Sequence, residues 1–119
     1  MLTKKEIGNL GESLAASYLV ELEYQILEKN WRYSRAEIDL IAKKKDILVF
    51  IEVKTRSYDY FGKPEEAVTA AKEHLIMDAA QRYMEQIGHD WEIRFDIISI
   101  ILDKKGQKHD IQHFEDAFF

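Results

Sequence analysis

Charged residues alternate with apolar, mostly β-branched residues along two stretches in the middle of the chain, residues 36–41 and 51–56. The short polar stretch 43–46 lies between them. Alternation with a period of two on both sides of a polar stretch predicts a β-hairpin. Because side chains two positions apart on a strand share a face, this hairpin gathers acidic and basic side chains on one surface.

The predicted hairpin also sets acidic side chains against one another across its strands. Closing it over a four-residue loop, residues 43–46, sets Glu37 opposite Glu52. In the same register, Asp39 lies opposite Phe50. Like charges opposite each other destabilise a sheet. We therefore expect a cation between these acids, and a divalent metal ion is the simplest candidate.

The remaining pattern predicts helices and further strands on both sides of the hairpin. Helical spacing predicts helices over residues 4–23 and 64–87, and alternation predicts strands over residues 24–33, 91–102 and 109–114. Thr3 and Glu6 match a capping box at the first helix, while Pro64 and Gly88 bound the second. The order α-β-β-β-α-β-β predicts a mixed sheet flanked by helices, with a parallel crossover through the second helix.

Composition and charge limit the function classes that fit this fold. The 119 residues are near the commonest size of a single domain, and 46% of them are hydrophobic. No cysteine is present, which excludes disulfides, zinc–thiolate sites and cysteine nucleophiles. The net charge of −5 argues against a protein that coats DNA through a basic surface. It does allow a nuclease whose acids hold metal and whose basic residues cluster locally.

Apolar segments give expectations about location and partners. The longest apolar run, residues 47–51, is far too short to span a bilayer. The first residues enter a helical pattern directly and lack the apolar region of a signal peptide. We therefore expect a cytoplasmic protein with no membrane association. The aromatic tail, residues 118–119, is expected to dock on the body or on a second subunit, as in a homodimer.

The spacing of the acids and one lysine suits metal-assisted cleavage of a phosphodiester. Asp39 precedes Glu52 by twelve intervening residues, and both offer hard oxygen ligands for Mg²⁺ or Mn²⁺. Lys54, two residues after Glu52, could orient the attacking water or stabilise developing negative charge. Glu37 and Glu12 could complete a second metal position or bind metal through water.

Four basic residues are candidates for contacts with nucleic-acid phosphates. They are Arg32, Arg35, Arg56 and Lys72. A simpler interpretation is open for the charged positions on the helices. Lys72 could extend from the edge of the core into solvent, and Glu12 could be a surface glutamate on a good helix.

A charged solvent face is the alternative to a site on the hairpin itself. Cross-strand Glu–Lys pairs on such a face contribute under about 1 kcal/mol each. The acids nevertheless lie within strongly apolar strands, which is typical of a site. The pattern alone leaves both interpretations open. The four histidines show no metal-ligand spacing with one another.

A series of short motifs follows in one order along the chain. They are Gly11-Glu12-x-x-Ala15-x-x-Tyr18-Leu19, Asn30-Trp31-Arg32, Glu37-Ile38-Asp39-Leu40-Ile41, Phe50-Ile51-Glu52-Val53-Lys54-Thr55-Arg56, Gly62-x-Pro64-x-x-Ala67-Val68-x-x-x-Lys72 and Arg94-Phe95-Asp96. Together, over about residues 8–100, they resemble the uncharacterised YraN-like family of small bacterial proteins. That family resembles the restriction-endonuclease-like, PD-(D/E)XK nuclease superfamily. Its glutamate on the first helix is similar to that of archaeal Holliday-junction resolvases.

This resemblance implies an α/β/α core and a metal-dependent nuclease site. By position, Glu12 corresponds to the acid of the first helix and Asp39 to the metal-binding aspartate. Glu52 corresponds to the second acid and Lys54 to the catalytic lysine. Ala36 departs from the glycine that the family usually has before Glu-Ile-Asp, a change that removes no ligand.

Three functions are consistent with these observations. The first is a Mg²⁺-dependent endonuclease that acts on DNA, with branched or repair intermediates as substrates. The second is a non-catalytic nucleic-acid-binding module on the same fold. The third is an adaptor that works through a protein partner or a dimer, which the acidic balance and the aromatic tail favour.

Overall fold

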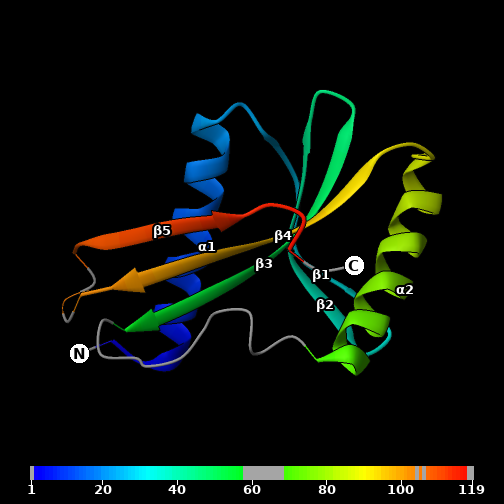
Figure 1. Ribbon diagram of the computed structural model, residues 1–119. Helices are drawn as coiled ribbons and strands as arrows, with labels where there is room; N and C mark the ends of the chain where they lie inside the picture. Colours follow the sequence, from blue (N-terminus) through cyan, green and yellow to red (C-terminus); the bar gives the residue numbers. More distant parts are fainter. Residues whose placement is uncertain (1, 58–68, 104, 106, 118–119) are drawn as a thin grey trace.

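The computed structural model describes residues 2–57, 69–103, 105 and 107–117. In this part of the chain, helices pack on both faces of a five-stranded mixed sheet (Figure 1). The elements are α1 (Lys4–Glu21), β1 (Gln25–Tyr33), β2 (Ala36–Lys44), β3 (Ile47–Ser57), α2 (Ala70–Ile87), β4 (Ile93–Leu102) and β5 (His109–Phe114). The predicted α/β class and element order are confirmed. The architecture is compatible with a restriction-endonuclease-like core.

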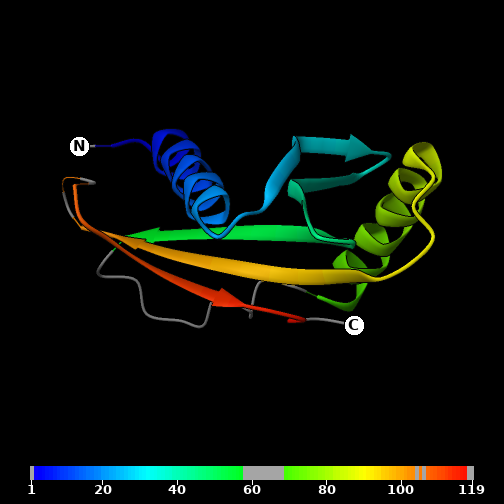
Figure 2. The same cartoon turned by 90° about the horizontal axis from the view of Figure 1, so that it is seen from above.

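The sheet has the spatial order β1-β2-β3-β4-β5. Neighbouring strands are antiparallel except for β3 and β4, which are parallel because the chain crosses over through α2. β4 is therefore an interior strand, as its apolar residues on both faces predict. Figure 2 shows α1 over one end of the sheet and α2 across the other.

The core has two parts, one on each face of the sheet. The part under α2 contains Ala36, Ile38, Ile41, Leu48, Phe50, Ile76, Ala79, Ala80, Tyr83, Phe95 and Ile97. The part under α1 contains Ala15, Ala16, Leu19, Tyr24, Leu40, Ala42, Val49, Ile51, Ile98, Ile100 and Leu102. Alternate side chains of β3 therefore face α1 and α2 in turn. The face on which each polar side chain at the end of β3 lies is fixed by the same alternation.

α1 begins with the capping box that the sequence predicts. The backbone N–H of Glu6 donates to the Thr3 hydroxyl at 3.1 Å, and the Glu6 carboxylate accepts from the Thr3 N–H at 3.0 Å. Further along, α1 passes close to β3 at Gly11. A Cβ added to Gly11 would lie 1.8 Å from the Thr55 hydroxyl oxygen, so only glycine allows this approach.

The structure describes α2 from its cap at Thr69. Thr69 is extended, and its side chain caps the helix by accepting from the backbone N–H of Lys72 at 3.1 Å. The predicted start at Pro64 lies outside the described residues. Gly88 ends the helix at φ 70°, as predicted. Neither helix that the structure describes is long and apolar enough to cross a membrane.

The turn between β2 and β3 is shorter than predicted. Lys44 pairs with Ile47, so two residues rather than four form the loop. Lys45 takes φ 55°, which a tight hairpin turn of this kind requires. The register is consequently shifted by two positions. A shift by two leaves every side chain on its predicted face.

The new register changes which residues face each other across the hairpin. Phe50 pairs with Ile41, so the predicted pairing of Phe50 with Asp39 is wrong. The ladder between β2 and β3 ends before it reaches Glu37 or Glu52, so that predicted pair is wrong too. The acids are instead found where the two strands separate.

Candidate functional site

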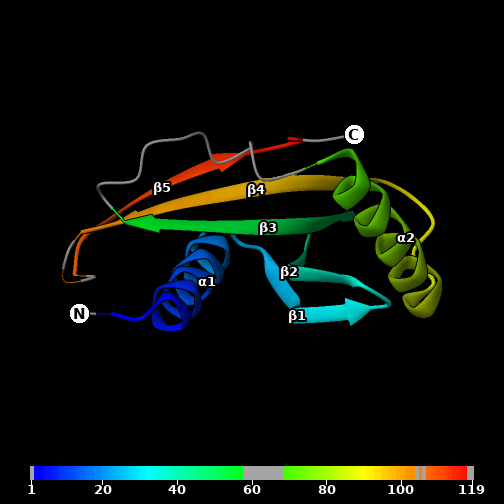
Figure 3. The ribbon, with the colours of Figure 1, turned by 90° about the horizontal axis from the view of Figure 1, so that it is seen from below.

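The site is built where β2 leaves β3. The two strands pair as far as Leu40 opposite Ile51, while β2 continues to pair with β1. In Figure 3, β1 and β2 lie away from the layer of β3, β4 and β5. At this branch, Asp39 Oδ2 accepts a 2.8 Å hydrogen bond from the backbone N–H of Val53. A side-chain carboxylate thus takes the place of a strand partner and is held against β3.

Glu52 lies on β3 next to this branch and accepts hydrogen bonds from two lysines. The Nζ atoms of Lys54 and Lys72 lie 3.0 Å and 2.6 Å from Glu52 Oε1. The side chains of Glu52 and Lys54 are only 9% and 10% exposed, whereas that of Lys72 is 35% exposed. Lys72 comes from the first turn of α2, so one buried carboxylate joins a strand to the start of a helix.

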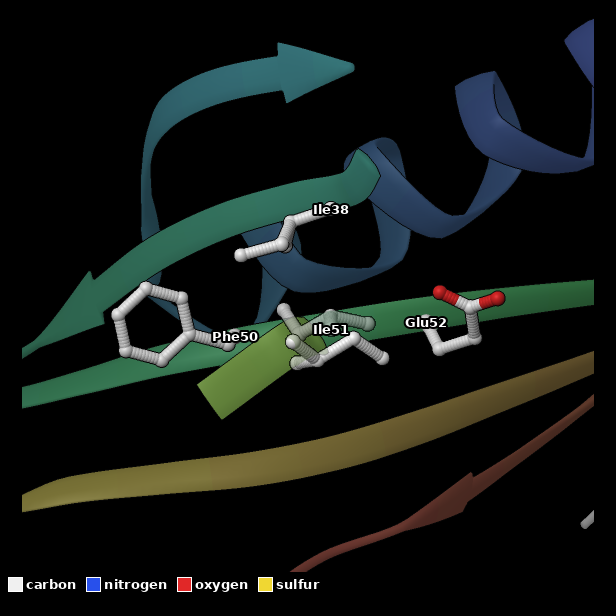
Figure 4. A pocket seen from close by; sticks show the side chains of 5 residues that line it. Ile38, Phe50, Ile51 and Glu52 are labelled. Carbon is white, nitrogen blue, oxygen red and sulfur yellow. The ribbon is translucent and has the colours of Figure 1, made fainter. Parts of the chain in front are cut away.

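Apolar side chains surround one flank of Glu52. Ile38, Phe50, Ile51 and Ile76 line a small hollow with it, which has no space for a water molecule. Figure 4 shows the Glu52 carboxylate on the side of β3 where Ile38 of β2 lies. The dry flank limits solvation of the carboxylate, and this strengthens its interaction with any neighbouring charge.

The acids at the branch repel one another. Burial, and then the charge of Glu52, raise the pKa of Asp39 to about 7. Glu12 and Glu37 act on Asp39 in the same direction, while the Val53 N–H opposes them. Four carboxylates from α1, β2 and β3 therefore share one electrostatic environment, which favours a cation.

The two lysines on Glu52 respond differently to the site. Burial lowers the pKa of Lys54, although Glu52 opposes that effect. Burial is also the largest single effect on Lys72 and lowers its pKa, but the hydrogen bond to Glu52, the charge of Glu52 and smaller effects of Lys54 and Asp39 together raise the pKa of Lys72. Lys54 is thus the ammonium that more readily gives up its proton.

Glu12 and Glu37 lie at the margin of the site. Glu12 on α1 is half-buried; burial raises its pKa, and a hydrogen bond from the Asn30 side chain opposes this. Glu37 forms a 2.7 Å ion pair with Arg32. The charges of Glu37 and Glu52 both raise the pKa of Glu12, so the helix acid lies within electrostatic range of the branch.

The four predicted phosphate contacts do not form one group. Lys72 lies inside the site on Glu52. Arg32, with its side chain 77% exposed, and Arg35 lie at the end of the β1–β2 hairpin. Arg56 lies on β3 beyond Lys54, where it donates to the backbone carbonyl of Thr55 at 3.2 Å. Basic side chains thus border the site from two sides.

The donor set fits Mg²⁺ or Mn²⁺ with two carboxylate ligands, Asp39 and Glu52. Among the described residues, no group of three or more histidine, aspartate or glutamate side chains could hold a metal ion. Mg²⁺ is commonly held by one or two carboxylates while it keeps several waters, so two are sufficient. The raised pKa of Asp39 and the two ammonium groups on Glu52 both indicate a place that attracts positive charge.

A second polar network, which includes Arg94 and Asp96 of the Arg94-Phe95-Asp96 motif, lies on the other face of the sheet. Asp96 is fully buried and accepts two 2.9 Å hydrogen bonds from Arg94. His113 Nε2 lies 2.6 Å from the same carboxylate, and His113 Nδ1 lies 3.1 Å from the Tyr18 hydroxyl. Asp96 pairs with Ile51 rather than Glu52 across β3 and β4. The network therefore fastens α1 and β5 to β4, behind the candidate site.

Sequence reasoning gave no role to the residues of this network or to Asn30, although two of them had a signal in the sequence. Arg94 and Asp96 are polar residues within the apolar strand β4, which indicates a buried pair. Asn30 precedes Trp31 in a predicted strand, where nothing indicated that it would contact Glu12. His113 gave no signal, because its partners are on other elements.

Comparisons with known proteins place this arrangement in a family. The sequence profile of the uncharacterised protein family UPF0102 matches residues 11–100. The chain is similar to a UPF0102 protein of Flavobacterium psychrophilum, with 45% identity over 100% of this chain and 98% of the relative. A UPF0102 protein of Christiangramia forsetii is 46% identical over the same shares. One of Clostridium perfringens is 44% identical over 96% of this chain and 94% of its own. The chain therefore belongs to the UPF0102 family, which confirms the YraN-like resemblance of its motifs.

Proposed function

We propose that this protein is a Mg²⁺-dependent endonuclease that cleaves phosphodiester bonds in DNA. One observation carries the proposal: Asp39 and Glu52, from different strands, meet at the branch of the sheet with an ammonium group 3.0 Å from Glu52. Two hard carboxylates suit Mg²⁺, and a metal ion with an ammonium group beside it can stabilise the charge that develops on a phosphate. The resemblance to PD-(D/E)XK nucleases supports the same assignment of residues.

Each residue of the site has a distinct task in this proposal. Asp39 and Glu52 hold the metal ion, which would lower the pKa of a bound water and stabilise charge on the phosphate. Lys54 is buried beside them with a lowered pKa, so it can donate a hydrogen bond to the scissile phosphate or exchange a proton with water. Glu12 and Glu37 act from the margin through their charge.

The basic residues around the site would contact the DNA backbone. Arg32 and Arg35 lie on the hairpin, and Arg56 follows Lys54 along β3. Because the chain carries a net charge of −5, binding depends on this local group rather than on the whole surface. We propose branched or repair intermediates as substrates, following the resemblance to junction resolvases.

A cleavage assay tests the proposal. Branched, flapped and single-stranded DNA are incubated with the protein and Mg²⁺ or Mn²⁺, beside Asp39→Asn and Glu52→Gln variants. Glu85→Gln, on the exposed side of α2, is the matched control. We expect metal-dependent cleavage by the wild type and the control only. Absence of cleavage from every substrate, or equal cleavage by the Asp39 variant, contradicts it.

The neutralisation of Glu52 by two lysines favours a second candidate, a nucleic-acid-binding module without catalysis. In such a module the lysines would complete the structure, and no metal would be needed. Salt-sensitive DNA binding that persists in Glu52→Gln, without any cleavage, would favour this candidate. Absence of binding at low salt would remove it.

A further inference from the structure

Glu52 is held by lysines from two different elements. Both ammonium groups use the same oxygen, Oε1, and the shorter distance, 2.6 Å, belongs to Lys72. Lys54 is on the same strand as Glu52, whereas Lys72 is brought by α2 from twenty positions along the chain. The contact of Lys72 therefore depends on where α2 begins.

Lys72 has an unfavourable place in its own helix. Its backbone N–H donates to the capping hydroxyl of Thr69, so it lies in the first turn of α2. The start of a helix carries partial positive charge and disfavours a cation. The short contact with Glu52 offsets this cost, and anything that neutralises Glu52 removes the compensation.

The two lysines differ in their ability to leave the site. Lys54 is only 10% exposed and is enclosed on β3, whereas Lys72 is 35% exposed on a long, flexible side chain. A divalent cation at Glu52 would repel both ammonium groups. Only Lys72 can move into solvent without carrying its charge through the core.

We infer that Lys72 is a positioning residue that exchanges with the metal ion: its ammonium group holds Glu52 in the metal-free protein and leaves when a divalent cation binds. This inference rests on the proposed metal site of Asp39 and Glu52. Lys54 stays 3.0 Å from Glu52, and the divalent cation takes over the charge that Lys72 supplied, so the buried carboxylate keeps a second positive neighbour in both states. The released ammonium group then lies at the rim of the site, where a substrate phosphate would arrive.

Metal affinity tests the exchange without any measurement of cleavage. Mn²⁺ alone is titrated into the wild type and into Lys72→Met, which keeps the length of the side chain and removes its charge. Because the variant has no ammonium group to displace, we expect it to bind Mn²⁺ about fivefold more tightly or better. Lys72→Arg, which restores the charge, should bind like the wild type. Lys108→Met, at an exposed lysine between β4 and β5, is the matched control.

Equal or weaker Mn²⁺ binding by Lys72→Met overturns the inference, as does binding by neither protein. Amide hydrogen exchange of the wild type provides a test that needs no variant. Mn²⁺ should speed exchange in the first turn of α2, and unchanged exchange there also overturns the inference. Cleavage by the wild type, with equal Mn²⁺ affinity in Lys72→Met, would support the proposed function and overturn the exchange. Tighter Mn²⁺ binding by Lys72→Met, without cleavage by the wild type, would support the exchange and contradict the proposed nuclease function.

Discussion

At the scale of single residues, the carboxylate of Asp39 is subject to two constraints. Its carboxylate satisfies the backbone N–H of Val53, and it also lies among the charges of Glu52, Glu12 and Glu37. The hydrogen bond fixes the position of the carboxylate, and the neighbouring charges make its ionisation costly. A residue under both constraints is typical of a functional site rather than of a solvent-exposed face.

The raised pKa of Asp39 makes stability depend on pH. Its carboxyl titrates at about 7 in the fold against a reference value of 3.8, so its stabilising contribution is complete below 3.8 and is lost as pH rises to about 7. Asp39→Asn keeps an acceptor for Val53 and removes the charge. We expect this variant to melt at a higher temperature than the wild type near about pH 8, with a smaller difference near about pH 4. Thermal unfolding across this range checks the prediction, and parallel pH profiles would contradict it.

Asp96 shows the opposite behaviour. Burial opposes its ionisation, but His113 and Arg94 lower its pKa overall. Its contribution to stability is therefore present above its ordinary pKa and is lost as pH falls below it. Asp96→Asn leaves Arg94 without its buried anion and should lower the free energy of unfolding by about 3 kcal/mol at neutral pH. Urea unfolding measures this change. Asp110→Asn, exposed on β5, should change it by less than about 0.5 kcal/mol, and equal effects would count against the network.

At the scale of elements, the alternation of the strands and the cap of the first helix were predictable from the sequence. The register between β2 and β3 was not. Alternation assigned the faces of β2 and β3, and the Thr3–Glu6 pattern located the start of α1. Residues 43–46 are all polar, however, so nothing in them distinguished a four-residue loop from the observed two-residue turn at Lys45. The place of Asp39 depends on that choice, because a two-residue shift moves it from opposite Phe50 to the branch.

The approach of α1 to β3 gives a test at this scale. Gly11→Ala places a Cβ 1.8 Å from the Thr55 oxygen, so the helix must move and Glu12 moves with it. We expect a loss of about 1–3 kcal/mol in the free energy of unfolding, as in overpacked cores. Gly8→Ala on the same helix is the matched control, because its Cβ meets no atom within 4 Å. That change should stabilise the protein by about 0.5–1 kcal/mol. Chemical denaturation measures the free energy of unfolding of both variants. A Gly11→Ala variant more stable than the wild type would contradict the close packing of α1 on β3.

At the scale of the whole molecule, the site is assembled from α1, β2, β3 and α2. The motifs named Glu12, Asp39, Glu52 and Lys54 from the sequence, and the fold brings their charges together. The contact of Lys72 with Glu52 could not be predicted, since it depends on the packing of α2 against the sheet. Lys72 forms an internal ion pair with Glu52, and its contact with a nucleic-acid phosphate stays a prediction.

The β1–β2 hairpin offers a test of DNA binding that leaves the core intact. Arg32 is exposed, and its ion pair with Glu37 is worth under about 1 kcal/mol. Arg32→Gln should therefore leave stability nearly unchanged while it weakens DNA binding and reduces the salt slope by about 1. Binding isotherms at several salt concentrations measure both quantities. Lys108→Gln is the control, and an equal loss in both variants would remove Arg32 from the interface.

The proposed function requires that Asp39 and Glu52 converge on one divalent cation. Diffraction from crystals grown with Mn²⁺, recorded to give an anomalous signal, tests it most directly. We expect a peak in contact with both carboxylates, with Lys54 beside it and Lys72 turned away from Glu52. Crystals that contain Mn²⁺ elsewhere but none between Asp39 and Glu52 would contradict it.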